Sequence, residues 1–256
     1  MTVHPLAEPF TSDGDATSPR GRIGVLLSHG FTGSPASMKP WAEYLAGQGY
    51  AVSLPRLPGH GTTWQEMNTT TWDHWTAEIE RAFEALANQV DTVFVCGLSM
   101  GGGLALRLAA DHPDRVAGLV LVNPAVGSNR LDVKLLPVLK HVVPSMPGIA
   151  NDIKKPGVEE HGYTKTPLRA ADSMFKGYKQ LRNDLGRITC PILIYRSAVD
   201  HVVDPSSARI IKAGVTSSDT HEESLENSYH VATLDNDAER IFEGSAAFIE
   251  RISGAG

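Results

Sequence analysis

The sequence predicts an α/β fold in which helices cover both faces of a mostly parallel sheet. Short apolar runs alternate along the chain with segments whose apolar residues recur at helical spacing. The runs are apolar at consecutive positions, as in Val116 to Val122, which is typical of strands buried on both faces. A chain of 256 residues, 41% of them hydrophobic, has enough apolar side chain for one large domain or two small ones.

The individual elements follow from this alternation. We expect strands at 24–28, 50–54, 92–96, 116–122 and 191–195, and an edge strand near His221. We expect helices at 34–47, 71–89, 104–110, 206–213 and 237–252. Ser34 is expected to cap the first helix, with Pro35 at its first position. Residues 1–22 are rich in Pro, Gly, Ser, Thr and Asp, and we expect a loosely held lead-in there.

The alternation is interrupted between the fourth and fifth strands. Residues 125–187 contain five prolines and no clear strand pattern, but a helical apolar period runs from Leu131 to Val142. A connection of this length is expected to have structure or a function of its own. We therefore expect a sheet domain formed by residues 1–124 and 188–256, with a mostly helical cap inserted at 125–187. The alternative is a mobile surface excursion.

Composition excludes several classes of partner. The formal net charge of −6 argues against binding to nucleic acids or anionic membranes, which requires a basic surface. The apolar runs are too short to span a bilayer, and residues 1–22 hold no signal-peptide core, so we expect a cytoplasmic protein. Cys96 and Cys190 lack the spacing of a metal or redox motif, and we expect no cofactor.

The segment Gly97-Leu98-Ser99-Met100-Gly101 matches the pattern G-x-S-x-G between an expected strand and an expected helix. Such a sharp turn places the serine at the sheet edge, and glycines are needed where a Cβ atom would collide. The start of the helix favours a developing negative charge beside Ser99. The segment does not match a phosphate-binding loop. Ser99 is therefore the candidate nucleophile; the alternative is a turn with glycines that serve packing.

A serine nucleophile requires a base, and the base requires a carboxylate that orients it. With this type of serine turn, the acid precedes the histidine along the chain. Asp200 follows the strand at 191–195 and lies at the edge where parallel sheets place their active groups. Asp204 is the rival, although Asp204-Pro205 is also typical of a helix start.

Three histidines follow the candidate acid. His201 is adjacent to Asp200 and is expected to point elsewhere, and His221 begins the expected edge strand. His230 lies in the loop before the last helix, which is the expected place of the base. Three histidines that precede the serine are expected to pack or to bond with loops: His29, His60 and His74.

Two backbone N–H groups are needed to bind the oxyanion of an acyl-transfer reaction. Met100, directly after the nucleophile, supplies the first. The segment at 29–33 follows the first strand and supplies the second from Phe31, because Gly30 and Gly33 allow the backbone to turn inward. No group of histidines, cysteines and carboxylates has metal-ligand spacing, so the sequence predicts no metal site.

Five segments together carry a family resemblance. They are HGFTG at 29–33, LPRLPGHG at 54–61, GLSMGG at 97–102, DHVV at 200–203 and NSYHVATLD at 227–235. With them the chain resembles the bacterial monoacylglycerol lipases and related small carboxylesterases of the α/β-hydrolase superfamily. The likeness extends from about residue 23 to residue 250.

This resemblance implies a Ser99, Asp200 and His230 triad, oxyanion donors at Phe31 and Met100, and a cap at 125–187 that covers the site. It also implies substrate contacts at the glycerol end. Those contacts would be Asn123 after the fourth strand, and Ile149 and Glu160 on the cap. Glu159 is an adjacent rival for the glutamate.

The sequence thus predicts a serine hydrolase that cleaves carboxylic esters, with a monoacylglycerol as the expected small lipid substrate. One alternative is a carboxylesterase without preference for glycerol, and another is a non-catalytic ligand-binding module on the same fold. The apolar residues from Leu131 to Val143 are expected to form the inner face of a cap, with at most transient contact to a membrane or micelle surface. The oligomeric state is not predicted.

Overall fold

A computed structural model describes residues 3–128 and 131–254, except for the side chains at 131, 132 and 134. Within these residues the main sheet has seven strands in the order β1-β3-β2-β4-β5-β8-β9, and only β1 runs antiparallel to its neighbour. The strands are β1 Phe10–Ser12, β2 Ile23–Ser28, β3 Ala51–Leu54, β4 Thr92–Leu98, β5 Val116–Val122, β8 Ile192–Ser197 and β9 Thr220–Leu225. The prediction of a mostly parallel sheet is confirmed.

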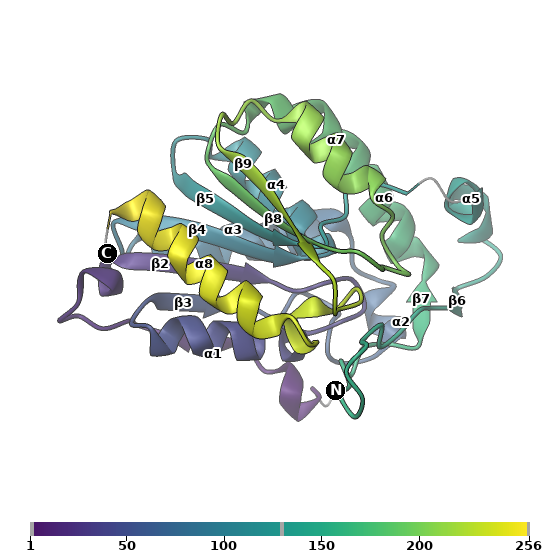
Figure 1. Cartoon of the computed structure of the whole chain (residues 1–256). Helices are drawn as coiled ribbons and strands as arrows, with labels where there is room; N and C mark the ends of the chain where they lie inside the picture. Colours follow the sequence, from purple (N-terminus) through teal and green to yellow (C-terminus); the bar gives the residue numbers. More distant parts are fainter. Residues whose placement is uncertain (1–2, 129–130, 255–256) are drawn as a thin grey trace.

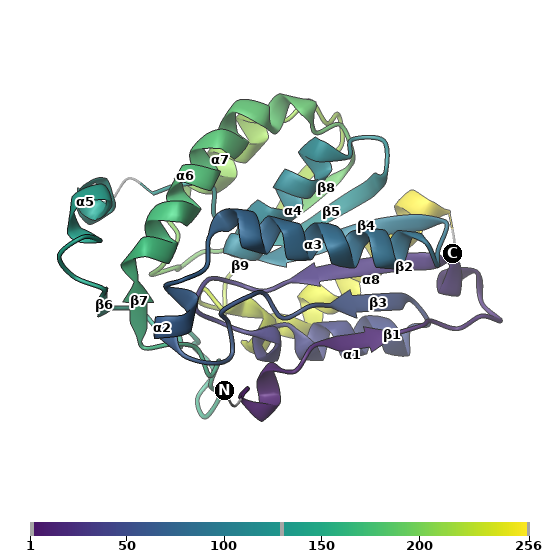
Figure 2. The same ribbon diagram turned by 180° about the vertical axis from the view of Figure 1, so that it is seen from behind.

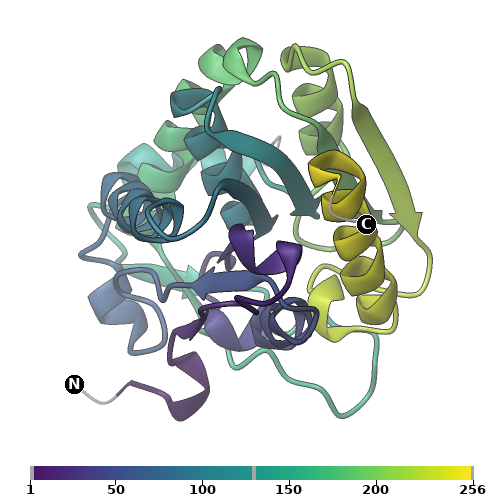
Figure 3. The ribbon, with the colours of Figure 1, turned by 90° about the vertical axis from the view of Figure 1, so that its left-hand side faces the viewer.

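Helices cover both faces of the sheet (Figures 1, 2 and 3). On one face lie α1 and α8, and on the other α3, α4, α6 and α7, each layer with its own apolar core. The bounds are α1 Lys39–Gly47, α2 Trp64–Met67, α3 Trp72–Ala87, α4 Met100–Asp111, α6 Leu168–Asp184, α7 Ser206–Gly214 and α8 Ala238–Ser253. Val25, Leu26 and Leu27 of β2 are fully buried, as expected for a strand between two helical layers.

The lead-in is more ordered than predicted. Residues 10–12 form the edge strand β1, with Thr11 opposite Ser53 of β3. The expectation of a loosely held segment is therefore wrong for this part of residues 1–22. The sequence Phe-Thr-Ser of this strand is too short to show an alternating apolar and polar pattern. Its extended conformation therefore depends on pairing with the neighbouring strand.

The first predicted helix also begins differently. Ser34 does act as a cap, but for a short 3-10 turn at Pro35–Ser37, and the α-helix α1 starts only at Lys39. The four-residue helix α2 was not expected. Its Thr63 cap accepts a hydrogen bond from the N–H of Glu66, but one turn of helix has too little periodicity to be recognised.

Of the described residues between 125 and 187, those up to residue 167 lie beyond the carboxyl ends of the strands, whereas α6 belongs to the helical layer on one face of the sheet (Figure 1). Residues 125–187 contain helix α5, Leu131–Leu139, then the strands β6, Ser145–Pro147, and β7, Lys165–Pro167, and finally α6. The antiparallel pair of β6 and β7 was not predicted. Helix α5 packs against α6, and α6 packs against α3 and α4. Residues 129 and 130 and the side chain of Leu131, which belong to the predicted cap, lie outside the described part.

None of the helices formed by the described residues combines the length and the apolar character needed to cross a membrane.

Candidate active site

Ser99 occupies the turn between β4 and α4. Its backbone has φ 57° and ψ −118°, a conformation that a residue with a side chain adopts only when its surroundings impose it. The Ser99 N–H donates to the carbonyl of Val122, and its carbonyl accepts from the N–H of Ala125. These bonds tie the turn to the end of β5, so the strained serine is held in place from the neighbouring strand.

The two glycines of the motif are required by close approach. A Cβ atom on Gly97 would lie 2.4 Å from the carbonyl oxygen of Gly101, and one on Gly101 would lie 2.0 Å from that of Ser28. Both distances are far inside van der Waals contact. The sharp turn that the motif predicts is therefore present, and it needs glycine on either side of the serine.

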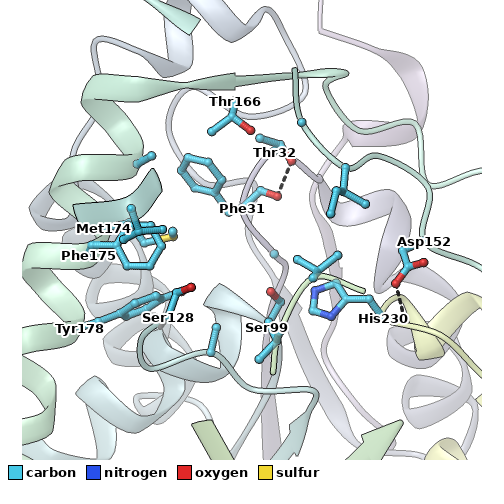
Figure 4. A pocket seen from close by; sticks show the side chains of 18 of the residues that line it. Phe31, Thr32, Ser99, Ser128, Asp152, Thr166, Met174, Phe175, Tyr178 and His230 are labelled. Carbon is cyan, nitrogen blue, oxygen red and sulfur yellow. Dashed lines mark hydrogen bonds between the residues drawn. The ribbon is translucent and has the colours of Figure 1, made fainter. Parts of the chain in front are cut away.

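His230 and Asp200 meet beside this turn. The Nδ1 atom of His230 lies 2.8 Å from Oδ2 of Asp200, and the other oxygen, Oδ1, accepts the N–H groups of Val202 and Val203 at 2.8 Å. Both Ser99 and His230 line the same cavity, and Figure 4 shows their side chains next to each other. The structure thus brings the three predicted triad residues together.

Charge and burial have opposite effects on the pKa values of His230 and Asp200. Burial disfavours the imidazolium, but the charge and hydrogen bond of Asp200, together with the charges of Glu160 and Asp152, raise the pKa of His230 above its ordinary value. Burial likewise disfavours the carboxylate, but His230 and two backbone N–H groups lower the pKa of Asp200. The pair is therefore suited to hold a proton on the histidine and a charge on the aspartate.

The rival residues lie elsewhere. Asp204 accepts the N–H of Ser206 at the start of α7, as expected for a helix start. His201 points to Asp152, with Nδ1 2.8 Å from Oδ1, and His221 pairs with Asp219 on the surface.

The loop after β2 passes directly over the serine. A Cβ atom on Gly30 would lie 3.4 Å from the Cβ of Ser99, and Phe31 lines the cavity. Met100 is the first residue of α4, where N–H groups have no acceptor within the helix. The predicted oxyanion donors thus belong to two backbone segments that flank Ser99.

A buried histidine holds that loop. His29 accepts the N–H of Leu57 at Nε2, 3.2 Å away, so its proton is on Nδ1 and is donated to the carbonyl of Gly30 at 3.0 Å. Burial lowers the pKa of His29 to about 4, which keeps it neutral. His60 packs edge-on against His29, and His74 completes the capping box of α3. The expected packing and loop roles of these three histidines are therefore observed.

The cavity above Ser99 has a volume of about 230 Å³ and is lined by both apolar and polar side chains (Figure 4). The apolar side is formed by α5, α6 and neighbouring residues, including Leu136, Leu168, Ala171, Met174, Phe175 and Tyr178. Polar lining side chains include Thr32, Asp152, Glu160 and Thr166. In Figure 4 Asp152 lies beside His230, across the cavity from Phe175 and Tyr178. An ester with one apolar and one polar end would fit such a lining.

Glu160, rather than its neighbour Glu159, lines the cavity. Its Oε1 would lie 2.6 Å from a Cβ atom on Gly33, whereas the Glu159 side chain is 72% exposed and pairs weakly with His161. Burial raises the pKa of Glu160, nearby His230 opposes this effect, and Asp152 adds to it. Ile149 lines the same cavity at its exposed rim.

Asn123 does not line this cavity. It borders a smaller cavity that Asp200 also lines. Its side-chain amide is bonded within the protein, since Nδ2 donates to the carbonyl of His230 and Oδ1 accepts the N–H of Ser197. The structure therefore brings Ile149 and Glu160 to the cavity that holds Ser99, but not Asn123.

Two carboxylates near His230 were missed, Asp235, which is buried, and Asp152, whose side chain is 10% exposed. Asp152 accepts the backbone N–H groups of His201 and His230, each at 3.2 Å. Asp235 accepts four backbone N–H groups, those of Lys154, Lys155, Tyr229 and Asn236. Asp235 ends the segment NSYHVATLD, so a signal was present, whereas Asp152 stands in no recognisable motif.

One group of side chains has the spacing of metal ligands. Glu80, Glu84 and His112 place their ligand atoms within 4.8 Å of one another on α3 and after α4. Among the described residues these groups already have partners, because His112 contacts both oxygens of Glu80 and Arg115 binds Glu84. The arrangement is a surface ion-pair network remote from the cavity.

The comparisons with known proteins agree with this fold. A family model described as serine aminopeptidase, S33, matches residues 19–237. The chain belongs to this family of serine hydrolases. Its fold is that of the α/β-hydrolases, and the resemblance stated from the sequence is confirmed.

Relatives of this chain include esterases and lipases. The thermostable monoacylglycerol lipase of Bacillus sp. (strain H-257) is 42% identical over 97% of this chain and 96% of its own length. The carboxylesterase of Bacillus subtilis (strain 168) is 27% identical over 96% of this chain and 97% of its own length. A solved structure from a description of LipS and LipT, two metagenome-derived lipolytic enzymes, has a TM-score of 0.92 and 44% identity, and covers 98% of this chain and 100% of that one.

Proposed function

We propose that the protein hydrolyses monoacylglycerols to glycerol and a fatty acid through Ser99, His230 and Asp200. The observation that carries this proposal is the 2.8 Å contact of His230 with Asp200 beside a strained serine, in a cavity lined by apolar and polar side chains. The 42% identical relative, a monoacylglycerol lipase, supports the substrate class.

In the first half of the reaction, the Oγ atom of Ser99 attacks the ester carbonyl while Nε2 of His230 takes the hydroxyl proton. The carbonyl oxygen becomes an oxyanion and binds the N–H groups of Phe31 and Met100. The Asp200 carboxylate stabilises the imidazolium that forms. His230 then gives its proton to the glycerol oxygen, the ester bond breaks, and the acyl group remains on Ser99.

In the second half, a water molecule takes the place of glycerol. His230 removes one of its protons, the resulting hydroxide attacks the acyl carbonyl, and the same two N–H groups bind the second oxyanion. The bond to Ser99 breaks, the serine recovers its proton from His230, and the fatty acid leaves along the apolar side of the cavity.

Glu160 and Ile149 are the proposed contacts for the glycerol end. The Glu160 carboxylate lines the cavity near His230 and Asp152, where it can accept hydrogen bonds from glycerol hydroxyls. Ile149 would cover the same end from the rim. The acyl chain would lie against α5 and α6, where each buried methylene contributes about 0.8 kcal/mol.

A cap at residues 125–187 is part of this proposal. Its α5 contributes Leu136 to the cavity, whereas Leu135 and Val138 of α5 are exposed. Val142, which follows α5, is exposed as well, so the expectation that the apolar residues from 131 to 143 form an inner face is correct for only some of them. These exposed residues would support transient contact with a micelle or lipid surface, since exposed apolar patches of this kind favour association. Flotation of the purified protein with neutral liposomes tests this contact, and a protein that stays in the dense fraction argues against it.

The second candidate is a carboxylesterase without preference for glycerol, which the Bacillus subtilis relative favours. The Glu160→Gln variant separates the two functions. It should lower kcat/KM for a monoacylglycerol while leaving an alkyl ester of the same acid unchanged. An equal effect on both substrates would favour the general esterase.

The experiment for the reaction itself is burst kinetics with a p-nitrophenyl ester. The wild-type protein should release one equivalent of p-nitrophenol quickly and should be labelled by a phosphonate, and the Ser99→Ala variant should do neither. Undiminished hydrolysis by Ser99→Ala would exclude this serine as nucleophile. Tight ligand binding without turnover or labelling would instead indicate a binding module.

A further inference from the structure

Asn123 lies at the point where β5 ends and the chain turns towards residues 125–187. It is 2% exposed and has φ 44°, a left-handed conformation that asparagine tolerates better than most residues. Its N–H donates to the carbonyl of Tyr195 in β8 at 2.8 Å. The residue is therefore fixed between two neighbouring strands at the edge where the site lies.

The side-chain amide joins β8 to the loop that carries His230. Its Nδ2 donates to the carbonyl of His230 at 2.8 Å and to Oγ of Ser197 at 2.9 Å, while Oδ1 accepts the Ser197 N–H at 2.7 Å. Ser197 in turn donates its hydroxyl to the carbonyl of Tyr229 at 2.8 Å. Asn123 and Ser197 thus hold two consecutive carbonyls of the loop at 227–231.

We propose that Asn123 is a positioning residue that fixes the backbone of His230, and that it does not bind the substrate. The inference rests on the proposed function, because it assigns to His230 the role of base. It differs from the expectation drawn from the family resemblance, in which Asn123 contacts glycerol.

The polar groups of His230 support this assignment one by one. Its backbone N–H donates to Oδ2 of Asp152 at 3.2 Å, its carbonyl accepts from Asn123, and its Nδ1 donates to Asp200. The remaining polar atom is Nε2, which the mechanism needs for the proton of Ser99. The loop around His230 is neither helix nor strand, so these side-chain bonds determine where the imidazole stands.

The location of the amide argues against contact with glycerol. Asn123 borders the smaller cavity that Asp200 also lines and not the one that holds Ser99. Both hydrogens and the oxygen of its amide are already bonded, so a glycerol hydroxyl would have to displace a buried protein bond. Binding of glycerol at this residue would therefore loosen the histidine on which the reaction depends.

The test compares Asn123→Gly and Asn123→Asp with the wild-type protein. Glycine removes the amide and relieves the positive φ, and aspartate keeps an acceptor for Ser197 but loses the donor to His230. The measurements are kcat and KM for a monoacylglycerol and for an alkyl ester of the same acid, and the labelling rate of Ser99 by a fluorophosphonate. All rates are expressed per titrated active site, so that partial unfolding does not enter.

We expect kcat to fall about 10- to 100-fold on both esters by the same factor, with KM changed less than about twofold, because a displaced base slows every acyl transfer. The labelling rate should fall to the same extent. Ser197→Ala, which keeps the bond from Asn123 to His230, should lose less. Asn88→Gly, at the exposed end of α3, should match the wild type.

A loss confined to the monoacylglycerol would make Asn123 a glycerol contact and would overturn the inference. Wild-type rates in both Asn123 variants would overturn it as well. A wild-type protein that neither hydrolyses esters nor reacts with the fluorophosphonate would contradict the proposed function first, and the inference with it.

Discussion

His230 and Asp200 form a buried pair in which Nδ1 lies 2.8 Å from Oδ2 and both side chains are less than a tenth exposed. The Asp200 carboxylate, together with the charges of Glu160 and Asp152, outweighs the burial penalty on the imidazolium. The pKa of the histidine is therefore raised above the ordinary value of 6.5. Since the base must be neutral to take the proton of Ser99, this relationship determines the pH range of the reaction.

The first prediction concerns the acid limb of the pH profile. A raised pKa means that His230 stays protonated and inactive to a higher pH, so kcat/KM should reach half of its maximum above pH 6.5. Asp200→Asn removes the charge that stabilises the imidazolium. It should move the limb to lower pH and reduce kcat by about 10³–10⁴-fold. The measurement is kcat/KM for a p-nitrophenyl ester from pH 5 to 9.

Asp204→Asn is the control for this prediction. Asp204 accepts the N–H of Ser206 at the start of α7 and does not bind His230 among its described contacts. The limb of this variant should coincide with that of the wild type. A limb that moves with Asp204 and not with Asp200 would reverse the assignment of the acid.

The second prediction concerns Gly101, the second glycine of the G-x-S-x-G motif. Gly101→Ala should destabilise the fold by about 3 kcal/mol or more, because its Cβ would lie 2.0 Å from the carbonyl oxygen of Ser28 and neither backbone segment can give way. Urea denaturation monitored by tryptophan fluorescence measures the change. The protein should also lose activity, since relief of the clash would move Ser99.

Gly47→Ala is the matched substitution. Gly47 ends helix α1, and a Cβ atom there would meet no heavy atom within 4 Å. Alanine should therefore stabilise the fold by up to about 1 kcal/mol through its lower conformational freedom. A destabilisation of equal size at both glycines would show that close approach is not the reason for Gly101.

Prediction from the sequence worked best where a local pattern forces the backbone. The flanking glycines predict the strained turn at Ser99. Runs of consecutive apolar residues, such as Val116–Val122, predict the central strands. The chain order of acid and histidine then located Asp200 and His230. These features depend on neighbours in the sequence or on a fixed topology.

What escaped prediction depends on contacts between distant segments. β1 exists only because β3 offers it an edge, and Asp152 becomes important only where its loop meets His201 and His230. An asparagine amide can form hydrogen bonds with a substrate or with the protein itself. The sequence alone does not distinguish these two uses, because it does not show which groups lie near the amide. For Asn123, the hydrogen bond to His230, more than a hundred positions away, is the observation from which we infer the second use.

The third prediction concerns Asp235, which is 2% exposed and accepts four backbone N–H groups. Two of these belong to Lys154 and Lys155 in the 125–187 segment, and one to Tyr229 beside the base. Asp235→Ala should cost about 3 kcal/mol of unfolding free energy, because it leaves several N–H groups without an acceptor. It should also lower kcat, since the loop of His230 loses its anchor.

Asp235→Asn removes fewer of these hydrogen bonds than Asp235→Ala does. The amide oxygen can still accept two N–H groups, but its NH₂ group faces the other two. Its unfolding free energy should lie between those of the wild type and the alanine variant. If Asp235→Ala retained wild-type stability, the four hydrogen bonds would carry no net energy. Hydrogen exchange at residues 154–155 and 229 would locate the loosened segment.

The last prediction concerns the apolar side of the cavity. Ala171 on α6 lines the cavity next to Leu136 and Leu168 and is 2% exposed. Ala171→Leu should place an isobutyl group where the proposed substrate has acyl carbons. Each methylene that is excluded from the cavity should lower kcat/KM about fourfold, the equivalent of 0.8 kcal/mol. The preference should therefore shift to shorter acyl chains.

A chain-length series of monoacylglycerols, run with both proteins, measures this shift. Gln180→Leu on the same helix adds a leucine at an exposed position away from the cavity and should leave the series unchanged. A uniform loss over all chain lengths in Ala171→Leu would indicate general damage to the site. An unchanged series would mean that the acyl chain does not lie against α6, and the apolar side of the cavity would then need another occupant.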